Sequence, residues 1–408
     1  MQKDARRTAE LAARTSYGRL LAILASGSRD ISAAEDLLSQ AFVAALKSWP
    51  ERGVPDNPDA WLLTAARNSQ RNLIRHAKVR DGAALEMERH FQELSESQQD
   101  FPDERLKMLF VCAHPAIDAA MRTPLMLQIV LGLDAVRIGS AFLVAPSTMG
   151  QRLVRAKAKI RDSGLRFTVP DSDVLPERLI DVLNAIYAAF GAAWDEMPGA
   201  AEGDQGLAEE AIYLGRLIAS LLPDEPEPKG LLALMLYCHA RRAARRDEYG
   251  KFVPLKQQDS GKWSRDMIIE AEQLLTLASR AATFGQYQCE AAIQSVHVQR
   301  AITGITNHKA LLALYDLLVA QCPTVGNLVS RAAMLLEAGD AQCAHEALAA
   351  LPPDLTARYQ PFWVTSAFVA LELEESARAK AAFETAIALT EDPAVRTFLT
   401  GHAQRATG

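Results

Sequence analysis

The sequence predicts an all-α protein with two small helical domains followed by a longer α-helical repeat region. Apolar residues recur at intervals of three and four along nearly the whole chain, which is the period of an amphipathic helix. Alanine and leucine, both strong helix formers, dominate the composition. Alternating apolar and polar runs, which indicate strands, are rare.

The composition is that of a packed protein without a membrane span. Of its 408 residues, 49% are hydrophobic and 23% charged, which is enough apolar material for the hydrophobic cores of two to four domains. The N-terminus is charged and lacks the apolar segment of a secretory signal, and no apolar stretch approaches the roughly 20 residues that a bilayer requires. The five cysteines form no CxxC pair, which favours a reducing, cytoplasmic environment.

The net charge of −6 hides a difference between the two parts of the chain. Residues 1–170 hold 24 Lys and Arg against 19 Asp and Glu, a net charge of +5. Residues 171–408 hold 20 against 31, a net charge of −11. Two parts with opposite charge suggest two kinds of partner.

Helix signals define a first domain at residues 1–77. Ser32 and Glu35 have the spacing of a capping box and predict a helix over 33–49, which either binds a partner or is ordinary core. Asn57 followed by Pro58 predicts an N-cap and first helical position, with the helix reaching about residue 76.

The second of these helices is basic. Arg67, Arg71 and Arg75 recur at helical spacing, and amide side chains between them can hydrogen-bond to bases. An alternative is that the arginines are simply solvated. Trp61 either stacks on an unpaired base or belongs to the core.

Residues 78–102 are polar and acidic and form an expected linker, and a second domain follows at 103–168. Helices expected over 124–132, 135–142 and 148–159, the last capped by Ser147, form a helix-turn-helix. Residues 122–166 carry eight basic and two acidic residues. In this motif the N-terminal part of the last helix lies in the major groove of DNA. A solvated helical face is the other interpretation of the basic run.

A second joint at 169–176 precedes the C-terminal extension, residues 177–408. Within it, residues 325–391 contain an internal repeat with an offset of 35, in which large and small residues alternate between two helices. This pattern is typical of tetratricopeptide repeats, although two ordinary alanine-rich hairpins would also produce it.

Motifs of enzymes are not found. The chain has no P-loop, GxGxxG, GxSxG or HExxH sequence, and no cofactor or metal site is indicated. Cys112 and His114 are two positions apart, which places them on different faces of a helix. We therefore expect a protein that is not an enzyme.

Together these segments resemble the extracytoplasmic-function (ECF) group of bacterial RNA polymerase sigma factors. Residues 34–42 (AEDLLSQAF) are similar to the core-binding helix of sigma region 2, and residues 60–68 (AWLLTAARN) to the helix that reads the promoter −10 element. Residues 122–166 are similar to region 4, which binds the −35 element and the polymerase β flap. Further segments, including 101–106 (FPDERL), 221–227 (LLPDEPE) and 230–235 (GLLALM), resemble the subgroup with a tetratricopeptide-like extension, often called ECF42.

The resemblance implies that the protein directs core RNA polymerase to specific promoters, inside a bacterial cell and at the nucleoid. It implies three sets of contacts. Core polymerase, through its β′ clamp, would be contacted by Asp36, Leu37, Gln40, Phe42 and Leu46. The −10 element would be contacted by Trp61, Arg67, Asn68, Gln70, Arg71, Asn72, Arg75 and His76. The −35 element would be contacted by Ser147, Thr148, Met149, Gln151, Arg152, Arg155, Lys157 and Lys159.

The acidic extension is expected to modulate this activity, through contacts with regions 2 and 4 or with a protein regulator. Two other functions fit the same sequence. One is a helical-repeat scaffold for protein interactions, and the other is an operator-binding regulator with a helix-turn-helix, which usually needs a dimer.

Overall fold

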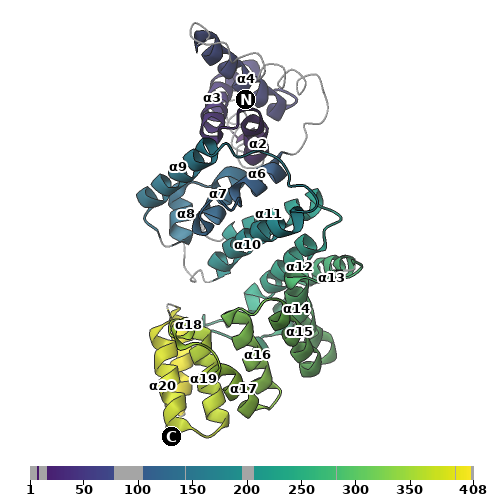
Figure 1. Cartoon of the computed structure of the whole chain (residues 1–408), viewed down its shortest axis with the longest axis vertical. Helices are drawn as coiled ribbons and strands as arrows, with labels where there is room; N and C mark the ends of the chain where they lie inside the picture. The colour runs from purple at the N-terminus through teal and green to yellow at the C-terminus, as the bar shows by residue number, and fades with distance from the viewer. Residues whose placement is uncertain are drawn as a thin grey trace. The chain divides into compact units, whose positions relative to one another are not determined.

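A computed structural model describes residues 7–8, 16–77, 104–142, 144–194, 206–281, 283–390 and 392–405. These ranges are helical with connecting loops, and the one β feature found in them is an isolated bridge between Arg246 and Phe252. The predicted all-α fold is therefore confirmed (Figure 1). The linker expected at 78–102 lies outside the described residues. Over the part that is described, every helix is too short or too polar to span a membrane.

The chain divides into two compact units, Met1–Ala193 and Trp194–Gly408. The helices of the first unit are α2 (Tyr17–Ser28), α3 (Ile31–Arg52), α4 (Pro58–Ala77), α6 (Arg105–Cys112), α7 (Ala119–Leu131), α8 (Ala135–Ala141), α9 (Pro146–Asp162) and α10 (Leu175–Trp194).

Helix α2 is the centre of the first unit. Residues 20–25 are consecutive and all buried, so the helix has no solvent-facing side over this stretch. It packs against α3 and α4 on one hand and against α6 and α7 on the other. An amphipathic helix would expose one face, but α2 exposes none over residues 20–25. The two domains expected from the sequence therefore share a core around this helix.

Two helix starts differ from the prediction. Asp30, not Ser32, caps α3, because its side chain accepts a hydrogen bond from Ala33 N at 3.1 Å. Helix α9 begins at Pro146, with Ala145 at the N-cap and no side-chain cap, so Ser147 is already inside the helix. Proline suits the first helical position, because its φ is already helical and an N–H there would have no partner within the helix.

Helix α10 begins after the predicted joint but packs within the first unit. The Arg122 guanidinium in α7 forms a 2.6 Å ion pair with Asp181, and the Thr123 hydroxyl donates to the carbonyl of Ala185 at 3.0 Å. Arg178 donates to the carbonyl of Phe110 in α6 at 2.9 Å. The first helix of the expected extension is thus bonded to the region that contains the predicted helix-turn-helix.

The second unit is a succession of helices in which most pack on the next, and α17 packs against α19 (Figure 1). Its helices are α11 (Gly206–Leu221), α12 (Pro226–Ala240), α13 (Arg265–Ala278), α14 (Gln286–Thr303), α15 (His308–Gln321), α16 (Val325–Glu337), α17 (Ala341–Ala349), α18 (Pro353–Thr356), α19 (Gln360–Glu372), α20 (Ser376–Ala388) and α21 (Pro393–Arg405).

The repeat predicted over 325–391 corresponds to two helical hairpins, α16–α17 and α19–α20. The equivalent small residues Ala332 and Ala367, and likewise Ala344 and Ala379, are fully buried. Leu348 and Phe383, one helical turn further on, fill the cores of the two hairpins. The small residues let neighbouring helices approach closely, as the sequence pattern predicted.

An irregular segment after α12 ties distant helices of the second unit together. The Arg246 guanidinium bonds to Asp392 before α21, and Phe252 packs edge-on against Phe398 at 5.5 Å. Arg300 of α14 donates to the carbonyl of Leu255 at 2.8 Å. The segment therefore contacts both α14 and α21, which are far apart in the sequence.

Candidate polymerase and nucleic-acid interface

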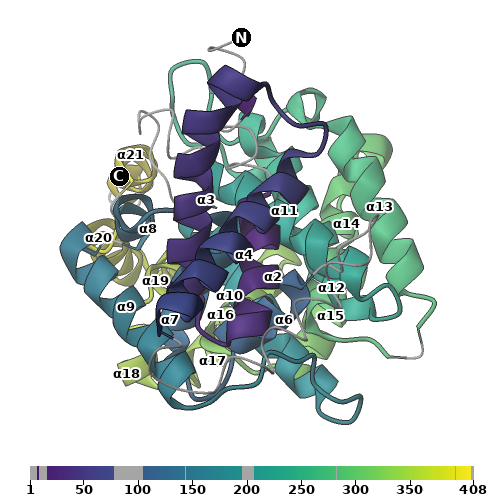
Figure 2. The same cartoon turned by 90° about the horizontal axis from the view of Figure 1, so that it is seen from above.

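Helices α3 and α4 form a hairpin that holds the first predicted site (Figure 2). Gly53 ends α3 with φ +89°, a conformation that side chains rarely adopt, and the chain turns back into α4. The Asn57 side chain accepts from Ala60 N at 3.0 Å, which agrees with the predicted N-cap of α4. At the turn, Trp61 packs edge-on against the buried Trp49, with ring centroids 5.5 Å apart.

The exposed face of α3 contains most of the residues predicted to bind polymerase. Asp36 and Gln40 are exposed, Leu46 is 48% exposed, and Phe42 is half-buried. Leu37 differs, because it is 5% exposed and belongs to the core. Val43, which was not among the contacts predicted from the sequence, is 51% exposed and lies one turn after Gln40. Helical spacing from Asp36 through Gln40 to position 43 was the signal that pointed to it.

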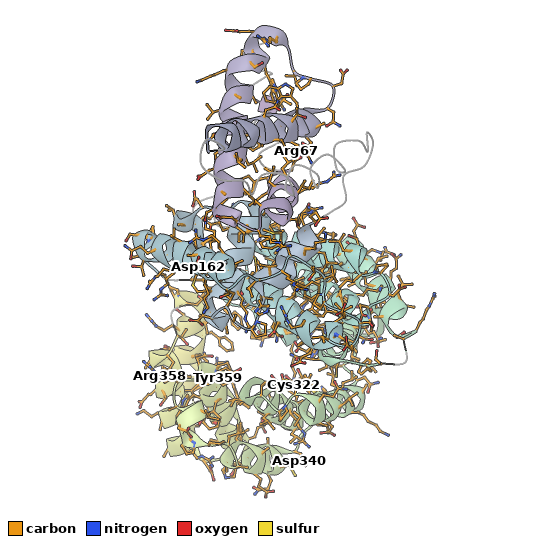
Figure 3. All side chains as sticks on the ribbon, turned by 45° about the horizontal axis from the view of Figure 1, so that its top comes forward. Arg67, Asp162, Cys322, Asp340, Arg358 and Tyr359 are labelled. Carbon is orange, nitrogen blue, oxygen red and sulfur yellow. The ribbon has the colours of Figure 1, made fainter. Side chains whose placement is uncertain are left out.

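The described side chains of α4 fall into two groups, one in the core and one at the surface. Leu62, Leu63 and Ala66 are fully buried, so this face holds the hairpin together. Arg67 is only 8% exposed (Figure 3), and a contact with DNA would require it to leave this position. Asn68 is exposed and Trp61 half-buried. The other predicted −10 residues lie on the described backbone of α4, but their side chains fall outside the described part: Gln70, Arg71, Asn72, Arg75 and His76.

Helices α7, α8 and α9 lie where the sequence predicts a helix-turn-helix. Gly132 ends α7 in the left-handed region with φ +72°, and the Asp134 side chain accepts from Arg137 N at 2.8 Å at the start of α8. The turn between α8 and α9 is closed by a hydrogen bond from Val144 N to the carbonyl of Gly139, 2.8 Å long. A Cβ at position 139 would lie 2.6 Å from the Val144 carbonyl oxygen, so the turn requires glycine.

Helix α9 has one buried and one exposed face. The buried face consists of apolar residues at helical spacing: Met149, Leu153, Ala156 and Ile160. The exposed face carries predicted −35 residues: Ser147, Gln151, Arg152, Arg155 and Lys159. Thr148 is half-buried. Met149, predicted from the sequence to contact bases, is 2% exposed and belongs to the buried face of α9.

Lys157 also differs from the expectation. Its side chain is 8% exposed and forms a 2.6 Å ion pair with Glu35 of α3. Arg161, near the end of α9, is bonded to Asp162 at 2.9 Å (Figure 3). The exposed positive charge of α9 that is not bonded to a carboxylate is therefore concentrated on Arg152, Arg155 and Lys159.

Cys112 and His114 do not form a reactive pair. Burial raises the pKa of Cys112 to about 12, which keeps the thiol protonated. The His114 Nδ1 accepts a hydrogen bond from Ala116 N at 3.1 Å, and burial together with Arg178 and Arg122 lowers the pKa of the ring. Cys112 is the last residue of α6, and His114 lies in the turn between α6 and α7.

Comparison with known proteins decides the family. Residues 13–80, which include α2, α3 and α4, match the model of sigma-70 region 2. This region 2 domain supports a sigma-70 family factor. Proteins of this family are not enzymes, and region 2 binds the RNA polymerase core and promoter DNA.

Other comparisons match proteins whose function is not known. Residues 178–279 match a family of unknown function, DUF6596. The chain is 34% identical over 370 residues to the uncharacterized protein R00370 of Rhizobium meliloti (strain 1021), which covers 88% of this chain and 87% of the relative. The two therefore belong to one family along nearly their whole length. No solved structure matches the chain.

Proposed function

We propose that this sigma factor is of the ECF type and directs core RNA polymerase to promoters through three surfaces of its first unit. The exposed face of α3 binds the β′ clamp, α4 contacts the −10 element, and α9 contacts the −35 element while its helix-turn-helix meets the β flap. The observation that carries this proposal is the exposed face of α9, which presents Gln151, Arg152, Arg155 and Lys159 from a helix whose other face is core.

The positions on α9 suit two different kinds of DNA contact. Gln151 and Arg152 lie in the first turns, the part of a recognition helix that reaches base edges in the major groove. An Arg bidentate to guanine, or a Gln bidentate to adenine, contributes about 1–3 kcal/mol of discrimination. Arg155 and Lys159 lie further along and suit phosphates, which add affinity that depends on salt but not on sequence.

The α3 surface suits a protein partner. Val43 and Leu46, about half exposed, form an apolar patch beside the polar Asp36 and Gln40. An apolar centre with polar neighbours is the usual composition of a protein interface. We propose that Val43 joins the predicted contacts with core polymerase.

For the extension, we infer a role in modulating the first unit. Helix α10 belongs to the matched family of unknown function and is bonded to α6 and α7 through Arg178, Asp181 and the carbonyl of Ala185. These bonds support a direct intramolecular route from the extension to region 4. The tetratricopeptide-like hairpins of the second unit, with their acidic surroundings, suit a protein partner rather than DNA.

The test is run-off transcription with purified core polymerase on the DNA upstream of the protein's own coding region. Arg152→Ala is expected to lower promoter-specific transcript about 5- to 150-fold, which corresponds to the loss of about 1–3 kcal/mol. The matched control is Arg358→Ala, an exposed arginine in the second unit (Figure 3). Equal transcription from Arg152→Ala and Arg358→Ala would refute the role of α9. A footprint formed without polymerase would favour the operator-binding alternative.

A further inference from the structure

The second unit holds two arginines on one face of α14, beside α12 (Figure 1). Gln294, His297 and Arg300 are spaced by three residues and therefore lie on the same side of this helix. At one end of the face, the Arg241 guanidinium donates to Gln294 Oε1 at 2.6 Å. At the other end, Arg300 donates to the carbonyl of Leu255 at 2.8 Å. The two guanidiniums thus flank His297.

Both guanidiniums are bonded to neutral acceptors. Arg241 is 7% exposed, and its other partners are the carbonyl of Tyr237 at 3.3 Å and Cys238 Sγ at 3.8 Å. Arg300 also donates to the carbonyl of Gln258 at 3.5 Å. With the described residues, neither arginine forms an ion pair to a carboxylate. A buried charge is normally paired, because removing an uncompensated charge from water is unfavourable.

Further positive charge surrounds His297. Burial and four neighbouring cations lower the pKa of its ring to about 4: Arg241, Arg300, His308 and Lys256. His308 begins α15, and Lys256 belongs to the irregular segment after α12. Cations from separate elements therefore converge on one ring, in a part of the chain whose net charge is negative. We call these five residues the cationic cluster.

A buried donor beside the cationic cluster also lacks a partner. Trp263 is 6% exposed, and the Arg300 guanidinium lies over its ring, with Cζ 5.4 Å from the ring centroid. The indole Nε1–H is shielded from solvent and makes no hydrogen bond to a described residue. Because buried N–H groups are nearly always bonded, this donor and the two unpaired guanidiniums indicate an acceptor that does not belong to the chain.

The charge of the cationic cluster indicates the class of this acceptor. Lys256 Nζ lies 3.4 Å from a carboxylate oxygen of Glu337. The next carboxyl group on α14, Glu290, accepts from Gln286 at 2.9 Å, and burial raises its pKa, which favours the neutral form. Two arginines and one lysine against the Glu337 carboxylate leave two positive charges in excess. A phosphate monoester, with about −1.5 to −2 charges at pH 7, balances them better than a carboxylate does.

We propose that the cationic cluster binds a small molecule through a phosphate dianion, either the free ion or a monoester. Arg241 and Arg300 would donate to its oxygens, since the guanidinium fork matches the geometry of phosphate. The ligand would enter from the side of Lys256, whose side chain is 55% exposed. This site lies outside the three surfaces proposed for polymerase and promoter, so it stands or falls independently of them. It would make the extension responsive to a small phosphorylated molecule.

The experiment is isothermal titration calorimetry of the full-length protein at constant ionic strength, which keeps the screening of surface charge equal. The titrants are inorganic phosphate, phenyl phosphate and acetate. The two phosphates are expected to bind saturably at one site per chain, and acetate much more weakly. Tighter binding of phenyl phosphate would identify a monoester as the ligand, and tighter binding of inorganic phosphate the free ion. Equal binding of acetate, or no saturable binding of either phosphate at millimolar concentration, would overturn the proposal.

Three variants locate the binding site. Arg300→Gln is expected to weaken phosphate binding about 10- to 150-fold, the loss of one hydrogen bond to a charged group. Lys256→Gln is expected to weaken it severalfold. The matched control is Lys262→Gln, an exposed lysine of the same segment whose charge is not among the four that act most strongly on His297.

Circular dichroism checks that each variant is folded. If Arg300→Gln does not fold, Lys256→Gln still provides the test, because its exposed side chain is not part of the core. Folded Arg300→Gln or Lys256→Gln with the same phosphate affinity as Lys262→Gln would contradict the placement of the site.

Discussion

Gly139 and Gly150 both lie in the helix-turn-helix, and the structure predicts opposite effects when each is replaced by alanine. A Cβ at position 139 would be 2.6 Å from the Val144 carbonyl oxygen, below the 3.0 Å that real Cβ atoms keep, so the turn must move by at least about 0.4 Å. A Cβ at position 150 meets only the Ala135 Cβ at 3.8 Å, an ordinary contact. The first change adds strain at a tight turn, and the second mainly improves helix propensity.

The magnitudes follow from these contacts. Overpacking costs typically about 1–3 kcal/mol, and alanine returns up to about 1 kcal/mol of helix propensity, so Gly139→Ala should lose about 1–2 kcal/mol. Gly150→Ala should gain about 0.5–1 kcal/mol. For a unit of this size, 1 kcal/mol changes Tm by about 2–4 °C. We expect the first unit to melt about 2–8 °C lower in Gly139→Ala and about 1–4 °C higher in Gly150→Ala.

The assay is thermal unfolding followed by circular dichroism, combined with run-off transcription. Because the turn at Gly139 positions the start of α9, its displacement should also reduce promoter-specific transcript about tenfold, the equivalent of one base contact. A Tm for Gly139→Ala equal to or above that of Gly150→Ala would refute the reasoning about this turn.

Two further predictions concern the second unit and the boundary between the units. Burial, together with Arg241, Arg300, His308 and Lys256, lowers the pKa of His297 to about 4, so the folded state favours the neutral ring. The unfolded ring takes up a proton near pH 6.5 and the folded ring only near pH 4, so the free energy of unfolding falls by up to about 3 kcal/mol as the pH drops from 6.5 to 4. Urea unfolding at several pH values should show this slope, and His297→Gln should remove it. A chain ending at Ala193 keeps α10 and should unfold cooperatively without binding a dye for exposed apolar surface. A chain ending at Pro176 loses the bonds of Arg122 and Thr123 to α10 and should bind the dye, and equal binding by the two chains would contradict the placement of α10.

Local sequence signals predicted the structure correctly where one or two neighbouring residues determine it. Asn57 and Pro58 begin α4 as expected, because an N-cap followed by proline has few alternatives. The start of α3 was less certain from sequence, since Asp30 and Ser32 are both good N-caps only two positions apart. The backbone conformation of a single residue decides between them, and no pattern in the sequence determines it.

In the candidate site, too, some burial follows from nearby positions in the sequence and some depends on distant partners. The burial of Met149 was open to prediction, because positions 149, 153, 156 and 160 have the spacing of one apolar helical face. The burial of Lys157 was not, because its partner Glu35 is 122 positions away and belongs to another domain of the expected organisation. The same holds for Gly18 of α2, where a Cβ would lie 1.8 Å from the carbonyl oxygen of Val130 in α7, a residue 112 positions away.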